Sequence, residues 1–479
     1  MKVALTLMAL LFAAVPQSDT KAARMLAKAE LRAEQGKFDE AHALYRRLAK
    51  KYPDTPEGVV GERRGTPSAY LGHGDVLRHG PSENRLDFVL MGEGYQITEM
   101  SAFAKLAGDV PGVFKRNEVF GEYYDYLNFL RADLVSADNG VDGYGRDYDT
   151  ALNGKTLGTF AGHVGIDRAA VRRMLEEMPE HDGQAIVFAK LGILGTGGGG
   201  VATIGGRNMA TMIHEIGHSF GGLSDEYTAL QAGRPKDAKP TRNTNIATSE
   251  DPDESPWSHF LEAKVRGVGM HPGGAQFVEG AWRPTAGKCS MASGGFFCPV
   301  CREELVLRLY SYCDPIDGAV PEPAAFDSDE ALSVGRRGLS FEVTAMQPTT
   351  HELLVHWWVI PEGEAPRPID VSPVQKRRRA KKGQSVAVAE SKVTTGPGGR
   401  RVAPPVPIEQ KPAKKTLPNR NGVHKFRVSA SDLGPGRYRV ICRVHDTTVV
   451  RGSRSPWVIK DEAGFLTSTV GWWVRLEED

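Results

Sequence analysis

The chain has 479 residues, of which 40% are hydrophobic and 25% are charged, as is ordinary for soluble globular proteins. Its 60 basic and 59 acidic residues leave a net charge of +1, so the overall charge gives no reason to expect nucleic acid or a membrane surface as a partner. Chains longer than about 250–300 residues usually fold into several domains, each with its own hydrophobic core. We therefore expect two or three folded units.

Residues 1–18 have the layout of a secretory signal peptide. A lysine at position 2 precedes an apolar run from Val3 to Val15, which is too short to span a bilayer, and the sequence turns hydrophilic at Gln17. A buried N-terminal helix is the alternative interpretation. No other run reaches 18 apolar residues, so we expect an exported protein, extracellular or periplasmic, without stable membrane insertion.

Residues 19–60 predict a short helical hairpin, because small and apolar residues recur at helical spacing on both sides of Gly36. Part of this stretch resembles the second half of a tetratricopeptide repeat, through Gly36, Phe38, Ala41, Tyr45 and Pro53. Such arrays need about three repeats to bury a continuous core. With one copy evident, we interpret the hairpin as an accessory that packs on its neighbour or docks a partner.

Strands and helices alternate between residues 84 and 325. Apolar runs at Asp87–Tyr95, at Leu127–Val135 and from Gln184 predict strands, and the stretch RAAVRRMLEEM before the third run predicts a helix. This alternation indicates an α/β unit.

Two loops of this unit raise the question of a bound ligand. The glycine run Gly195–Gly206 lacks the Gly-Lys-Ser/Thr of a phosphate-binding loop. We interpret it as a flexible rim beside an active site, and the neighbouring Val201–Ile204 as a strand that could pair with an extended peptide. The acidic run Ser136–Asp149 could bind calcium, but it lacks the spacing of an EF-hand, which favours a solvated turn.

The stretch TMIHEIGHSFGGLSDEY, from Thr211 to Tyr227, carries the clearest chemistry. On a helix, His214 and His218 lie one above the other, about 6 Å apart at Cβ, and two imidazoles so placed can share one tetrahedral metal ion. Glu215 then lies near the water that such an ion would hold. Apolar residues recur on the opposite face, which predicts a buried helix with its histidines turned toward a cleft. A core helix with two incidentally stacked histidines is the alternative.

The third ligand is sought after the paired glycines that end this helix, where the chain can turn back. The nearby oxygens belong to Ser224, Asp225 and Glu226. Serine is a poor zinc ligand, whereas either carboxylate is suitable. The residues alone therefore leave Asp225 and Glu226 open.

The run HEIGHSFGGLSDEY resembles the metzincin signature, and more narrowly the peptidase family typified by bacterial immunoglobulin A metalloendopeptidase, as do FVLMGEGY upstream and CSMASGGFFCPVCREEL downstream. The resemblance implies a zinc peptidase with His214 and His218 as ligands, Glu215 as catalytic base and Met291 in the turn beneath the metal.

One departure from that signature concerns the third ligand. The general spacing places it at Ser224, one residue before Asp225. The ending DEY is similar to metzincins whose aspartate ligand precedes an x-Tyr pair, so we predict Asp225 as the ligand and Glu226 as a hydrogen-bonding supporter. Tyr227 is a candidate donor to the oxyanion.

Four of the five cysteines, including the pair in CPVC, fall within one short stretch. Four clustered cysteines could hold a structural zinc. In an exported chain we favour one or two local disulfides instead, and Cys289 with Cys298 brackets the loop around Met291 that such a bond would stiffen.

The remaining sequence, at residues 335–479, consists of short β-branched and aromatic runs separated by Gly and Pro, which predicts an all-β, immunoglobulin-like sandwich. A basic insertion at about 370–420 has almost no large apolar residue and is expected to be a disordered, solvated linker. An anionic surface or partner is the alternative role for it.

The sequence therefore predicts a secreted zinc metalloendopeptidase that acts on protein or peptide substrates. It would combine a helical hairpin, an α/β zincin-like catalytic domain at 84–325, and a C-terminal β-sandwich that could bind a surface or protein partner. Two alternatives stay open: a non-catalytic binding or adhesion protein on a protease-like scaffold, and a zinc hydrolase of a non-protein substrate, because the ligand motif does not define the substrate.

Overall fold

The computed structural model describes most of the chain, namely residues 20–157, 162–190, 194–206, 208–228, 237–367, 394–395, 401–402, 406–419 and 421–477. The predicted signal peptide and most of the predicted basic insertion lie outside these residues. None of the helices described combines the length and the apolar character needed to cross a bilayer.

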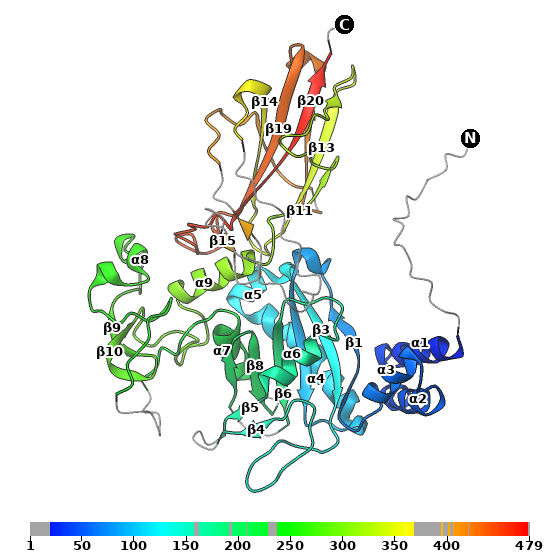
Figure 1. Ribbon diagram of the computed structural model, residues 1–479. Coiled ribbons are helices and arrows are strands. Elements are labelled where there is room, and N and C mark those ends of the chain that lie inside the picture. Colours follow the sequence, from blue (N-terminus) through cyan, green and yellow to red (C-terminus); the bar gives the residue numbers. More distant parts are fainter. Residues whose placement is uncertain are drawn as a thin grey trace.

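The N-terminal part of the structure consists of α1 (Lys21–Glu34), α2 (Phe38–Lys51) and α3 (Pro56–Arg64). The Thr20 hydroxyl caps α1 by accepting the Ala23 N–H at 3.0 Å. Two of these helices, α1 and α2, lie within residues 19–60, where the sequence predicts a helical hairpin, and α3 follows them. The helices lie against the edge strand β1 (Ala69–Leu77), where the buried Tyr45 hydroxyl donates to the Leu71 carbonyl at 2.7 Å (Figure 1).

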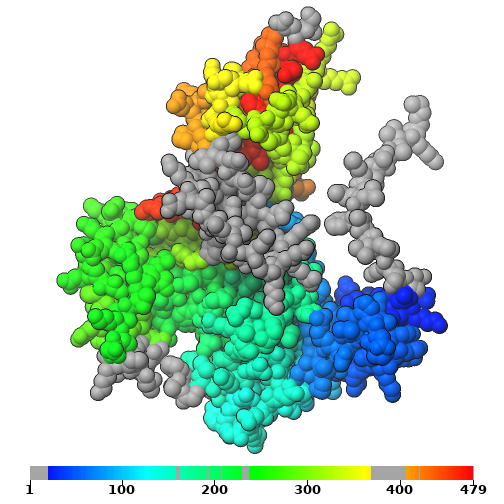
Figure 2. All heavy atoms as spheres, viewed as in Figure 1, coloured from blue at the N-terminus to red at the C-terminus, as the bar shows by residue number. Residues whose placement is uncertain are grey.

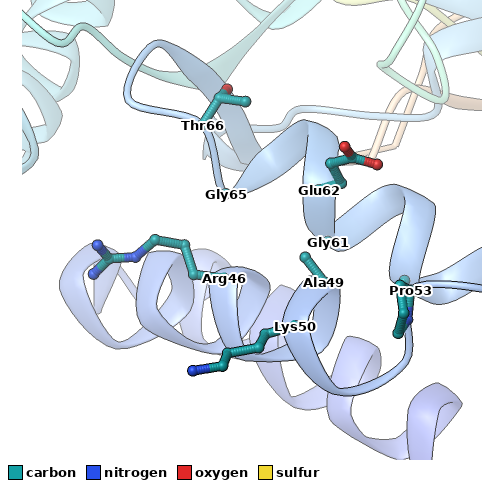
Figure 3. A pocket seen from close by; sticks show the side chains of 9 residues that line it. Arg46, Ala49, Lys50, Pro53, Gly61, Glu62, Gly65 and Thr66 are labelled. Atoms are coloured by element: carbon teal, nitrogen blue, oxygen red, sulfur yellow. The ribbon is translucent and has the colours of Figure 1, made fainter.

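A hollow between α2 and α3 is lined by side chains that include Arg46, Lys50 and Glu62 (Figure 3). Glycine lets α3 approach α2 closely here, since a Cβ at Gly61 would lie 2.8 Å from the Tyr45 carbonyl oxygen. The hollow belongs to the accessory helices and contains none of the predicted site residues.

Within the described residues, six strands form the central sheet, in the order β1-β3-β2-β6-β8-β7. The predicted strands appear as β2 (Leu86–Glu93), β3 (Leu127–Val135) and β6 (Gln184–Ala189). They run parallel with β8 (Val201–Gly205), whereas β1 and β7 (Thr196–Gly198) are antiparallel edge strands. All eight residues of β2 are buried, as expected for a parallel strand covered on both faces.

Helices cover both faces of this sheet. In β2, Phe88 and Leu90 point into a core shared with α4 (Met100–Arg116) and α7 (Met209–Ser219), while Val89 and Met91 point into a second core shared with α6 (Arg168–Leu175). This alternation follows from the period of two along a strand. The other elements of the region are α5 (Glu118–Glu122), α8 (Ser258–Glu262), α9 (Pro299–Tyr310), β4 (Lys155–Thr156), β5 (Val164–Gly165), β9 (His271–Gly274) and β10 (Phe277–Arg283).

The described C-terminal residues form two further sheets. One contains β11 (Ile316–Val320), β13 (Leu339–Ala345) and β18 (Val423–Val428), and the other contains β12 (Leu332–Ser333), β14 (Leu354–Pro361), β17 (Lys414–Thr416), β19 (Gly436–His445) and β20 (Thr467–Leu476). A separate short pair joins β15 (Thr394–Thr395) to β16 (Arg401–Val402).

Aromatic rings connect the two C-terminal sheets. Phe341 of β13 lies 4.9 Å from Trp472 of β20, and Trp357 of β14 stacks on Phe426 of β18 at 5.0 Å, measured between ring centroids. The β-rich character predicted for this region is therefore present, while its immunoglobulin-like type stays a prediction. In Figure 2 these sheets and the N-terminal helices project from different sides of the central part.

A buried ionic cluster joins the C-terminal sheets to the central region. His351 Nδ1 lies 2.8 Å from Glu122 Oε1 of α5, and its Nε2 lies 2.7 Å from Asp446 Oδ1, which follows β19. The hydroxyls of Tyr123 and Tyr310 donate to the other oxygen of Asp446. Burial lowers the pKa of His351, but the two carboxylates raise it, to about 9 overall, so the imidazole is a cation at neutral pH.

Raising the pH is expected to weaken this junction. The contribution of His351 to stability is fully present below its unfolded pKa of about 6.5, and it is lost as the pH rises through its folded pKa of about 9. We expect His351→Ala, which leaves two buried carboxylates without their cation, to lower the free energy of unfolding by about 3–5 kcal/mol at neutral pH.

The matched control is Lys425→Ala, which removes a surface ion pair with Glu342 and should cost less than about 1 kcal/mol. Denaturant unfolding followed by circular dichroism measures both variants. Equal, small losses would contradict a stabilising role for the His351 cluster.

Candidate metal centre

His214 and His218 lie one turn apart on α7, directly after β8 of the central sheet. Their Nε2 atoms are 3.1 Å apart and their side chains are 21% and 17% exposed, whereas Met212 and Ile216 on the same helix are buried in the core. The predicted amphipathic arrangement is therefore present.

The loop after α7 brings Asp225 to the two histidines. Gly222 has a φ of +63°, a conformation that favours glycine, and the Leu223 N–H returns to the Gly217 carbonyl at 3.0 Å, which ends the helix. Asp225 Oδ1 then lies 3.2 Å from both Nε2 atoms. Ser224 is engaged elsewhere, since its Oγ accepts from the Asn243 amide at 2.8 Å.

These three side chains form a histidine–aspartate group (His214, His218 and Asp225) whose donor atoms all converge. His214 Nδ1 lies 2.7 Å from the Ser290 carbonyl and His218 Nδ1 lies 2.7 Å from the Leu223 carbonyl. A carbonyl only accepts, so each Nδ1 carries a proton, and in the neutral form of each ring Nε2 turns its lone pair inward. Asp225 Oδ1 is buried and has no hydrogen-bond partner among the described residues.

Three lone pairs this close repel one another unless a cation lies between them. Burial lowers the pKa of His214, but the Asp225 carboxylate and the Ser290 carbonyl raise it, to about 9 overall. Burial raises the pKa of Asp225, yet the two histidines hold it well below its usual range. The histidine–aspartate group therefore favours binding of a cation between its ligand atoms. Two imidazoles with one carboxylate suit a divalent transition metal such as zinc.

Glu215 lies on the same helix and is buried at 7% exposure. Burial raises its pKa, while the two histidines lower it by a smaller amount. The glycine-rich segment passes directly over it, because a Cβ at Gly195 would lie 2.8 Å from Glu215 Cγ and one at Gly197 would lie 2.7 Å from His218 Cβ. The glycine run thus borders the site, where side chains would obstruct α7.

The suggestion that Val201–Ile204 pairs with a peptide is wrong. These residues belong to β8, which is already paired with β6 on one side and β7 on the other. Within the part of the chain that the structure describes, β7 (Thr196–Gly198) is the edge strand beside α7. Only an edge strand has free backbone groups for a further strand.

Met291 packs beneath α7, the helix that carries the two histidines. A Cβ at Gly217, between the two histidines, would lie 2.3 Å from Met291 Sδ, so the thioether lies directly on the helix backbone. The Met291 carbonyl accepts the Glu226 N–H at 2.7 Å, next to the Ser290 carbonyl that orients His214. The Ser290–Met291 turn thereby supports both the helix and the ligand loop.

The two residues after Asp225 have different surroundings. Tyr227 lies stacked over His214, with ring centroids 6.4 Å apart, and burial raises its pKa, which keeps the phenol protonated. Glu226 is not brought to the histidines: it is fully buried, and its Oε1 lies 3.0 Å from Cys301 Sγ and 3.2 Å from the Asn245 amide.

Gln276 is a site residue that the sequence analysis missed. Its side-chain amide donates to Asp225 Oδ2 at 2.6 Å and leaves Oδ1 for the histidines. Gln276 lies between β9 and β10, 51 residues after Asp225. Nothing in its local sequence indicates this contact.

The predicted Cys289–Cys298 disulfide is not formed in the structure, where all five cysteines are free thiols. The suggested calcium loop at 136–149 gains no support either. Asp138 and Asp142 use their carboxylates to accept the backbone N–H groups of Asp149 and Tyr148. Among the described residues, this run is absent from the groups able to hold a metal.

Comparison with known proteins adds one finding. Residues 75–267 match the model of the family described as IgA Peptidase M64, and no curated protein matches the chain. The matched segment includes the histidine–aspartate group and Glu215 but ends before Met291. Over residues 75–267 the chain is therefore similar to the IgA peptidase family, and this match supports an IgA-type metallopeptidase.

Proposed function

We propose that this protein is an exported, zinc-dependent metalloendopeptidase with a metzincin-like centre. His214, His218 and Asp225 would hold the ion, and Glu215 would act as the general base. The observation that carries the proposal is the convergence of three ligand atoms, Asp225 Oδ1 and the two histidine Nε2 atoms, which lie 3.1–3.2 Å from one another. The buried Glu215 lies on the same helix as the histidines.

The chemistry of the proposal follows from the surroundings of each residue. A bound zinc ion would supply Lewis acidity toward the scissile carbonyl and the attacking water. Glu215 takes a proton from that water and passes it to the leaving amine, and its raised pKa brings it closer to neutral pH, where such transfer is efficient. The protonated Tyr227 phenol can donate to the oxyanion that develops on the carbonyl.

The edge strand β7 supports an extended peptide as substrate. Its free side can add a strand through main-chain hydrogen bonds, and its glycines, Gly197 and Gly198, allow close approach beside α7. We also propose export by the N-terminal signal peptide, and a surface or protein partner for the C-terminal sheets.

Chelation tests this function. Treating the full chain with a zinc chelator is expected to abolish cleavage of a general fluorogenic protein substrate, and added zinc should restore it. Proteolysis that persists after the metal has been removed would refute a metalloendopeptidase. A zinc-loaded, folded chain that cleaves no protein substrate would favour the non-protein hydrolase or the binding protein.

A further inference from the structure

We propose that Glu226, Cys289, Cys298 and Cys301 form a second metal site, one that takes a thiolate-binding divalent cation such as zinc and has a structural role. This cysteine–glutamate group is distinct from the histidine–aspartate group, although Glu226 directly follows Asp225 in the chain. Its existence does not depend on the proposed peptidase activity.

The geometry matches a four-ligand site. All four donor atoms lie within 4.8 Å of one another. Cys289 and Cys301 have their sulfurs 3.7 Å apart, and Glu226 Oε1 lies 3.0 Å from Cys301 Sγ and 3.7 Å from Cys298 Sγ. Tetrahedral zinc, with bonds of about 2.3 Å to sulfur and about 2.1 Å to oxygen, requires S···S edges of about 3.8 Å and S···O edges of about 3.6 Å.

The local structure favours thiolates. Cys298 and Cys301 have the C-x-x-C spacing common in structural zinc sites, and Cys298 is the N-cap residue of the 12-residue helix α9, whose N-terminus favours negative charge. The backbone N–H groups of Met291 and Cys298 point to Cys289 Sγ at 3.5 and 3.4 Å. Such donors orient and stabilise a ligating sulfur.

Charge and burial favour a metal over a disulfide. The four side chains are at most 1% exposed. Besides the cysteines, the carboxylate of Glu226 contacts the neutral Asn245 amide and Thr285 hydroxyl. A disulfide would use two sulfurs and leave the third with a buried carboxylate, at a high desolvation cost. A dication bound by all four groups would remove this cost.

The position of the group gives it a role. Cys289 immediately precedes Ser290 and Met291, which support His214 and α7, and Glu226 immediately follows Asp225. One ion would therefore crosslink the Ser290–Met291 turn beneath α7 to the loop that carries Asp225. This crosslink would fix the position of the turn and of the loop, and so support the histidine–aspartate group.

Metal analysis and cobalt substitution of the full chain test the site, with the protein prepared under reducing conditions. We expect two equivalents of zinc, and on cobalt substitution an intense near-ultraviolet band from thiolate-to-cobalt charge transfer. The histidine–aspartate group contains no sulfur, so this band reports the cysteine–glutamate group alone. His214→Ala should lose one equivalent and keep the band, which separates this proposal from the proposed function.

Cys301→Ser should lose the band and one equivalent, whereas Cys313→Ser, at a buried cysteine outside the group, should keep both. If Cys301→Ser does not fold, the wild-type spectrum decides. A single zinc equivalent, no thiolate band, or a disulfide found among Cys289, Cys298 and Cys301 by peptide mapping of the unreduced protein would overturn the proposal.

Discussion

Glu215→Gln is expected to lower kcat/KM for peptide hydrolysis by about 100-fold to 10,000-fold, the usual contribution of a general base. Glutamine keeps the shape and burial of the side chain but cannot accept the proton of the attacking water. Because the donor atoms of His214, His218 and Asp225 are unchanged, the metal should stay bound.

Initial rates on a fluorogenic peptide, together with elemental analysis, measure both parts of this prediction. The matched control is Glu304→Gln on α9, a glutamate that pairs with Arg308 at 2.6 Å, and it should retain activity. Undiminished hydrolysis by the Glu215→Gln protein would rule out the assigned base. Loss of both the metal and the activity would instead indicate that Glu215 maintains the geometry of the histidine–aspartate group.

Asp225→Ala is expected to weaken metal binding at the histidine–aspartate group by at least about 100-fold, because loss of a supporting partner alone already costs about 10-fold to 100-fold. Activity should fall with the metal. Titration against a competing chelator measures the affinity, and metal content measures the stoichiometry.

Glu226→Ala should affect the other metal site, and Ser224→Ala is the control for both variants. The Glu226 variant should lose the ion of the cysteine–glutamate group while the histidines still bind theirs, since Glu226 Oε1 faces Cys301. The Ser224 variant should keep both ions, because Ser224 Oγ is bonded to Asn243. Retention of the histidine-bound metal in Asp225→Ala would defeat the ligand assignment.

Local sequence was sufficient for the elements whose geometry is periodic. The apolar runs at 87–95 and 127–135 became β2 and β3 of the sheet, and the histidines four residues apart came together on α7. Helix and strand periods are properties of the backbone alone. The paired glycines also predicted the turn after α7, because a φ of +63° at Gly222 is readily adopted only by glycine.

Long-range contacts were beyond the sequence analysis. Pairing with an extended peptide was expected for Val201–Ile204, but the edge of the sheet is β7, because strand order depends on which distant segments pair. Gln276 was missed for a similar reason, since its contact with Asp225 spans 51 residues. The junction through His351 likewise joins residues more than 200 positions apart.

The sequence by itself determined the chemistry that is available: two histidines and a glutamate on one helix, carboxylates after the turn, and cysteines in one short stretch. Only the tertiary structure decided how these groups divide, with Asp225 directed to the histidines and Glu226 to the cysteines. Adjacent residues in a loop have no fixed periodicity, so their directions depend on the partners that packing supplies. Here the Gln276 amide and the Met291 turn orient the loop, and both come from segments 50 or more residues away.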